Sequence, residues 1–163
     1  MPNSSGHDYQ SAGNSSGDPN FGHTFGVEYG ALEIKDVFEV QGIGEDTEQV
    51  RHGTGGDHAG SVFVHAGQNK VRPVTIKRYI TVGAPPALAM IWAKVAAATT
   101  GQVERETLAI QWFDDAGEKV AVEINFREAW MSDYKGPQFD HTASEPATEE
   151  ATFHCEVMSV VKS

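Results

Sequence analysis

The chain has 163 residues, enough for one domain with a sizeable core, and a formal net charge of −11. The excess of 23 acidic over 12 basic side chains argues against wrapping nucleic acid through phosphate contacts and against docking on anionic lipid. The single cysteine, Cys155, excludes an internal disulfide and fits a reducing compartment. Because no segment approaches the roughly 20 apolar residues of a membrane helix, we expect no membrane anchoring.

Residues 1–20 form a distinct N-terminal segment. They contain no Ile, Leu, Val, Phe or Trp and are rich in Ser, Gly, Asn and Asp. Such a stretch buries too little apolar area to offset the entropy lost on ordering. We therefore predict a disordered arm over 1–20 and a single folded domain over 21–163.

Three segments follow in the first half of that domain. Residues 23–29 alternate apolar and polar side chains, which predicts a strand, and residues 37–43 predict a second strand. Residues 45–52 carry strand-compatible Thr47 and Val50, but neither face of the segment is apolar. A strand that is polar on both faces cannot cover a core. The segment is either a loop or a strand with water on one side and a partner chain on the other.

Glycines and strand signals alternate over the next stretch. The four glycines of 53–60 predict a mobile loop, 61–66 a short strand, and Gly67–Lys70 a turn. Residues 73–80 then alternate as a strand that begins at Pro73. One face of this strand carries Val74, Ile76, Arg78 and Ile80.

A helix is predicted over about 85–99. Pro85 and Pro86 suit a first helical turn, where backbone N–H groups lack partners. Alanine, the best helix former, fills much of the segment, and Gly101 predicts the end of the helix, because glycine commonly follows the last helical turn. An apolar stripe at helical spacing predicts that the helix packs on the sheet and buries Trp92. The stripe consists of Leu88, Ile91, Trp92 and Val95.

The clearest hairpin follows the helix. Two alternating segments, 108–113 and 119–126, flank the turn Asp114–Gly117, in which Gly117 can adopt a positive φ. Residues 136–150 predict a long excursion, and 151–160 a final strand with Phe153, Cys155 and Val157 pointing inward. The predicted core residues of the helix and hairpin are Leu88, Trp92, Ile110, Trp112, Val122, Ile124 and Phe126.

These elements predict a mainly β fold. We expect a small antiparallel β-barrel or two-sheet sandwich with one flanking α-helix at about 85–99.

No catalytic or metal-binding pattern stands out in this chain. His52, His58 and His65 lie around the glycine-rich loop, but their spacing matches no paired ligand motif. Asp114 and Asp115 are adjacent on a turn, where such residues usually shape the turn. Cys155 alternates with apolar residues and reads as a small hydrophobe, not a nucleophile. We expect no enzyme activity, no cofactor and no metal.

From about Phe21 to the C-terminus the chain resembles the inner-tube proteins of contractile phage tails and contractile injection systems, the haemolysin-coregulated-protein-like tube superfamily. The resemblance lies in the order and spacing of several short motifs over most of the chain. Members of the family often continue after Gly-Pro with an Asn-containing turn and an Asn-Glu pair, whereas this chain has Gln138–His141 and Glu145–Pro146. The motifs are Phe38–Ile43 followed by Glu45–Glu48, Val74–Arg78, Leu88 with Trp92, Phe113–Gly117, Ala129–Trp130 and Tyr134–Pro137.

The resemblance implies a structural subunit that assembles into stacked hexameric rings around a central channel for cargo or DNA. It implies sheath and baseplate proteins as partners, and a protein that is cytoplasmic before assembly and then part of a virion or injection particle. Ring closure by strand pairing would remove exposed sheet edges, which are a hazard for a monomer. Candidate assembly or lumen residues are Glu45, Thr47, Gln49 and Arg51, since a polar channel wall would let cargo slide.

Three alternatives remain open on the sequence alone. The chain could form the adaptor ring that starts the tube, instead of the main tube. It could be a monomeric β-barrel module that binds a small ligand or peptide in an apolar pocket. It could also be a hydrolase that uses the histidine-containing loop, which would require clustered His and acidic groups with perturbed pKa values.

Overall fold

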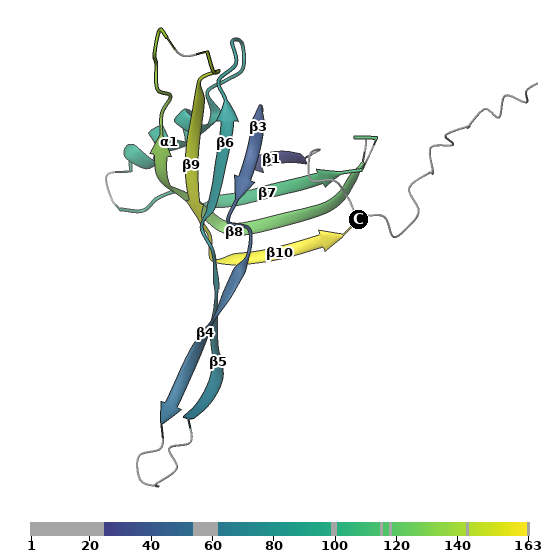
Figure 1. Cartoon of the computed structure of the whole chain (residues 1–163), viewed down its shortest axis with the longest axis vertical. Coiled ribbons are helices and arrows are strands. Elements are labelled where there is room, and N and C mark those ends of the chain that lie inside the picture. The colour runs from purple at the N-terminus through teal and green to yellow at the C-terminus, as the bar shows by residue number, and fades with distance from the viewer. Residues whose placement is uncertain are drawn as a thin grey trace, which may run out of the picture.

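The computed structural model describes residues 25–53, 62–98, 101–114, 116–117, 119–142 and 144–162. The predicted arm at 1–20 and most of the glycine-rich loop lie outside these residues, so those two predictions stay predictions. The described chain is mainly β with one helix, as the sequence predicts (Figure 1). Its elements are β1 (Phe25–Tyr29), β2 (Leu32–Ile34), β3 (Val37–Gln41), β4 (Glu45–Gly53), β5 (Val62–Val71), β6 (Val74–Tyr79), α1 (Ala87–Ala96), β7 (Glu106–Phe113), β8 (Val120–Lys135), β9 (Thr148–His154) and β10 (Val157–Lys162).

The strands form an antiparallel sandwich of two layers. The main sheet has the order β2-β1-β7-β8-β9-β6-β3, with β10 also paired to β8, while β4 and β5 pair only with each other. We call β3, β6, β9 and the second half of β8 the four-stranded layer, and β2, β1, β7, the first half of β8 and β10 the five-stranded layer. Among the described strands the sheet ends at β2 and β3 without closing. Of the two architectures predicted, the sandwich is the one observed.

The long strand β8 connects the two layers. Its residues up to Ala129 pair with β7, and its residues from Trp130 onward pair with β9. Near the junction of these parts Glu128 adopts a φ of 54°, which residues other than glycine rarely adopt, and the register against β7 shifts. The sequence predicted a strand ending at Phe126, because neither glycine nor proline marks this bend.

The core lies between the two layers and under α1. On β6, Val74, Ile76 and Arg78 are buried, as the alternation predicts, while Ile80 lies beyond the strand end and is 40% exposed. The helix begins after Pro86 and buries Ala87, Leu88 and Ile91. Trp92 is half-buried and stacks on Tyr134 of β8, with ring centroids 6.2 Å apart. The helix therefore closes one side of the sandwich.

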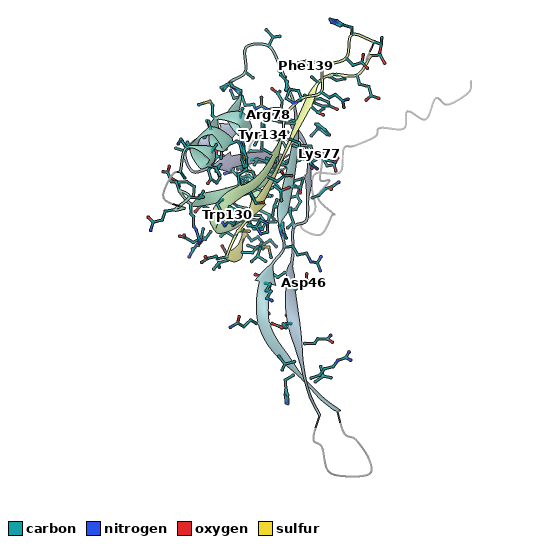
Figure 2. All side chains as sticks on the ribbon, turned by 90° about the vertical axis from the view of Figure 1, so that its left-hand side faces the viewer. Asp46, Lys77, Arg78, Trp130, Tyr134 and Phe139 are labelled. Atoms are coloured by element: carbon teal, nitrogen blue, oxygen red, sulfur yellow. The ribbon has the colours of Figure 1, made fainter. Side chains whose placement is uncertain are left out.

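A buried ion pair lies in the four-stranded layer beneath the helix. Nε of Arg78 lies 3.2 Å from Oε1 of Glu149, and both side chains are almost fully buried. Tyr134 donates a hydrogen bond of 2.8 Å from its hydroxyl to Oε2 of Glu149. Arg78 also donates to the carbonyl of Pro85, just before the helix. The pair thus connects β6, β9 and β8 to the start of α1 (Figure 2).

Two predicted boundaries are wrong. Gly67–Lys70 is no turn, because β5 continues through it with a register shift. A Cβ at Gly67 would lie 2.9 Å from the carbonyl oxygen of Glu48. Glycine at this position therefore allows β5 to approach the backbone of β4 closely. The predicted strand 151–160 is two strands, β9 and β10, and the break between them leaves Val157 49% exposed. The helix Ala87–Ala96 lies within the predicted range of about 85–99.

We predict that Glu149→Gln strongly destabilises the subunit. The substitution leaves Arg78 buried without its counter-charge, and removing one partner of a buried pair typically costs about 3–5 kcal/mol. Urea unfolding of the unassembled subunit measures the loss. The matched control is Glu150→Gln, the next residue, which pairs with Lys135 at the surface and should cost less than about 1 kcal/mol. Equal stability of the two variants would contradict this account.

Candidate assembly surfaces

The four-stranded layer ends in two strand edges that carry no further strand among those described. β3 is the last strand of the main sheet and pairs only with β6. From Trp130 to Lys135, β8 pairs only with β9 among the described strands. Unpaired edges expose backbone N–H and C=O groups and serve as templates for pairing with another chain. This layer therefore offers one complementary edge on each side.

The outer face of the four-stranded layer carries rows of polar side chains. In one row Glu39 of β3 lies opposite Lys77 of β6, Lys77 lies opposite Glu150 of β9, and Glu150 lies opposite Lys135 of β8. Nζ of Lys77 lies 3.4 Å from Oε1 of Glu39, and Nζ of Lys135 lies 3.2 Å from Oε1 of Glu150. The charges alternate in sign across the whole layer. Figure 2 shows Lys77 on the face opposite to Arg78 and Tyr134.

A second row lies next to the charged one and is neutral at its centre. Thr75 and Thr152 share a hydrogen bond of 3.2 Å between their hydroxyls, and they are flanked in register by Gln41 of β3 and Asp133 of β8. Sequence reasoning assigned one face of β6 to Val74, Ile76 and Arg78, but it did not find these rows on the other face. The rows depend on which strands are neighbours in the sheet, and the alternation of residues within one strand does not reveal its neighbours.

The hairpin of β4 and β5 projects from the body as an arm. It leaves the end of the four-stranded layer as a continuation of β3 and β6, roughly along the longest axis of the molecule (Figure 1). Residues 45–51 are all exposed except Val50, which is partly covered, and Val64 on the partner strand is 55% exposed. A two-stranded hairpin without a packed face is marginally stable in water. The arm therefore has the properties of a segment that packs on another chain.

The root of the arm is well defined. Arg72 and Asp46 form a two-point ion pair across the two strands, with Nε 2.8 Å from Oδ2. This hydrogen bond lowers the pKa of Asp46 below its ordinary value. At Gly42 the φ is +84°, and a Cβ would lie 2.2 Å from the carbonyl oxygen of Pro73, so only glycine fits. These contacts fix where the arm leaves the body.

The candidate assembly residues Glu45, Thr47, Gln49 and Arg51 all lie on β4, in this arm, and all are exposed. The sequence left open whether 45–52 is a loop or a strand that faces a partner chain, and the segment is a strand. Its contact with a partner chain stays a prediction. The predicted core residues divide into two groups. Leu88, Ile110, Ile124 and Phe126 are buried, whereas Trp92, Trp112 and Val122 are half-buried.

An apolar groove is the candidate site for a small ligand. It has a volume of about 350 Å³ and lies between α1 and the β1–β2 turn, with Lys94, Glu104 and Glu106 among its lining residues. The described residues contain no group of three or more His, Cys, Asp or Glu side chains placed to hold a metal ion. Within the same part of the chain, no helix has the length and apolar character to cross a membrane.

Cys155 lies at the break between β9 and β10 and is half-buried. Burial raises the pKa of its thiol from 9.0 to about 11. Because the thiolate is the reactive form, this position suppresses nucleophilic chemistry at neutral pH.

The family comparison matches almost the whole folded domain. The model of the T4-like virus tail tube protein gp19 family matches residues 22–159. The chain belongs to this tail tube family. No curated protein sequence matches this tail tube protein significantly.

Solved structures share the fold of this tail tube protein. The anti-feeding prophage cap, described as the AFP tube-terminating cap, superposes with a TM-score of 0.76 at 19% identity, over 96% of this chain and 99% of that one. The sheath-tube complex of the PVC extracellular contractile injection system in its extended state gives 0.74 at 21% identity, over 89% and 93%. The sheath/tube terminator of the same system gives 0.74 at 20%, over 90% and 99%. The family match makes the chain a tail tube component, and these structures, at 19–21% identity, share its fold.

We predict that Cys155 reacts slowly with iodoacetamide at pH 8. A thiol pKa raised to about 11 lowers the thiolate fraction about 100-fold relative to an exposed thiol. The rate should recover to that of an ordinary thiol in urea, which makes the unfolded chain its own control. A folded-state rate within a few-fold of the unfolded rate would contradict the assignment of Cys155 as an inert packing residue.

Proposed function

We propose that this chain is the structural subunit of a rigid inner tube, assembled from stacked hexameric rings around a channel that carries cargo or DNA. It has no catalytic role in this proposal. The family membership supports a tube component, and the geometry of the subunit supports the finer assignment. We further propose that the chain is cytoplasmic before assembly, and that a sheath surrounds the tube while a baseplate starts it.

The observation that carries this proposal is the pair of unpaired edges in the four-stranded layer. Neighbouring strands in this layer are antiparallel, from β3 through β6 and β9 to β8. Because the layer has an even number of strands, β8 and β3 run in opposite directions. Pairing β8 of one subunit with β3 of the next continues the antiparallel sheet. Repeated around a ring, this heterologous contact closes without leaving any edge of the layer exposed.

The arm supports stacking along the tube axis. It extends from one end of the body, and its strands pair only with each other in the subunit (Figure 1). If the arm packs on the adjacent ring, the contact is again between unlike surfaces and repeats without limit, which gives an open-ended filament. Exposed Val64 and the polar residues of β4 would then be covered by a neighbouring ring.

The channel wall in this proposal is the outer face of the four-stranded layer. Paired charges and threonine hydroxyls cover much of that face, so a passing polypeptide or nucleic acid meets mainly hydrated side chains. The exception is the stacked ring pair of Phe38 and Tyr79, which are 37% and 40% exposed. The balanced charges of the row mean that this wall is less acidic than the chain as a whole. Glu45, Thr47, Gln49 and Arg51 remain candidates for the wall or for the stacking contact, because the arm continues from the same layer.

Two other functions fit particular observations. The same edges and arm would serve an adaptor ring at the start of the tube equally well. The apolar groove beside α1, with Tyr29 and Ile91 in its lining, is the feature that would serve a monomeric ligand-binding module.

We predict that the purified protein forms rings or tubes under mild conditions. Sedimentation velocity and negative-stain microscopy at increasing protein concentration measure this directly. Assembly should persist in moderate salt, because backbone pairing and apolar contacts are weakly screened. A monomer at high concentration, with and without sheath or baseplate proteins, would contradict the tube assignment and favour the ligand-binding module.

We predict that removing the arm separates ring formation from stacking. The carbonyl of Gly44 accepts a hydrogen bond of 2.9 Å from the backbone N–H of Arg72, and Val71 packs against the core of the body. A short glycine linker that replaces residues 46–70 therefore removes the arm and keeps these contacts. The expected product is single rings that do not stack, because the edges of β3 and β8 are intact.

Thermal melting and circular dichroism of the armless variant provide the control for folding of the body. Tubes of normal length from this variant would show that the arm has no role in stacking. Folded monomers alone would show that the arm, and not the β3 and β8 edges, holds the ring together.

A further inference from the structure

The charged row on the four-stranded layer ends in opposite charges at the two free edges. Glu39 is the member on β3, and Lys135 is the member on β8. Lys135 has a side chain that is 66% exposed and contacts Glu150 on one side only. From the ends of this row we propose that Lys135 of one subunit pairs with Glu39 of the next copy and sets the register of the ring. This inference rests on the proposed tube function.

The neighbouring row fits the same register. When Lys135 lies beside Glu39 of the second copy, antiparallel pairing places Asp133 beside that copy's Gln41. The Gln41 side-chain amide can donate to the Asp133 carboxylate, so both rows become continuous across the subunit boundary. The charged row then alternates in sign all the way round the ring, with no two like charges adjacent.

Register selection is the physical need that this row meets. A slip of one residue turns the core face of an edge strand outward, and the burial pattern already forbids it. A slip of two residues preserves the faces, so burial does not forbid it. In one direction that slip places Asp133 beside Glu39 of the next copy, which is repulsive. In the other direction it places Lys135 beside Gln41 and loses the ion pair.

The direction of the strands fits the register in which Lys135 lies beside Glu39 of the next copy. β3, β6 and β9 run roughly along the longest axis of the molecule, as the arm does (Figure 1). If the arm reaches the next ring along the tube axis, these strands also run close to that axis. In a closed sheet, strand tilt and stagger are linked, and strands parallel to the axis require little stagger between subunits.

Single charge reversals test the pairing. In Glu39→Lys, the introduced lysine meets Lys135 of the next identical copy, and in Lys135→Glu, the introduced glutamate meets Glu39. Each variant alone should therefore repel itself at every boundary, and its critical concentration for assembly should rise by about tenfold or more, measured by sedimentation and negative-stain microscopy. In a 1:1 mixture every boundary between unlike copies brings a lysine beside a glutamate, in the native or the reversed order, so mixing the two variants should restore assembly if the register is as proposed.

The double variant Glu39→Lys with Lys135→Glu restores an attractive pair at every boundary and should assemble alone near the wild-type concentration. This keeps the test valid if either single variant folds poorly. Thermal melting of each monomer checks folding. The matched control is Glu33→Lys, which reverses a charge in an exposed ion pair on β2, in the other layer and outside the β3 and β8 edges, and it should assemble like the wild type.

Impaired single variants, with assembly restored in the double variant, support the pairing. Single variants that assemble normally, or a folded double variant that stays unassembled, overturn it while leaving the tube function intact. A wild-type protein that forms no rings at all contradicts the proposed function instead, so the two failures are distinguishable.

Discussion

The fold depends on one strand that belongs to both layers. β8 pairs with β7 as far as Ala129 and with β9 from Trp130 onward, so the backbone bend at Glu128 lies where the strand passes from one layer to the other. A residue other than glycine at positive φ is unfavourable by about 1 kcal/mol or more, and such strain persists only where surrounding contacts enforce it. Here β7 and β9 enforce it through their pairing with β8. The bend also releases the second half of β8 from β7 and so creates a free edge.

That free edge links the fold of the subunit to its assembly. The buried Arg78–Glu149 pair and the Trp92–Tyr134 stack hold β6, β9, β8 and α1 together on the inner face. On the outer face of the same strands, exposed ion pairs contribute little to the stability of one subunit. In the proposed ring, their role is to place a negative charge at the β3 edge and a positive charge at the β8 edge, and these two charges meet only between two copies.

The sequence predicted the class of fold well and the contacts between strands poorly. Alternation located β6, β7 and the first half of β8, because one face of each strand is apolar, and proline placed the start of α1. Glu128, Gly67 and the break after His154 were missed, since tertiary pairing and not local propensity decides them. The candidate residues of β4 were chosen because the segment is polar on both faces. The row from Glu39 to Lys135 joins residues far apart in sequence, and no spacing rule reveals it.

A reconstruction of the assembled tube at side-chain resolution tests the central claim most directly. The account predicts that β8 of each subunit lies antiparallel to β3 of the next, that the polar face of the four-stranded layer lines the channel, and that the arm contacts an adjacent ring. A channel lined by contiguous Leu, Ile or Phe side chains, or rings in which the β3 and β8 edges stay apart, would contradict it.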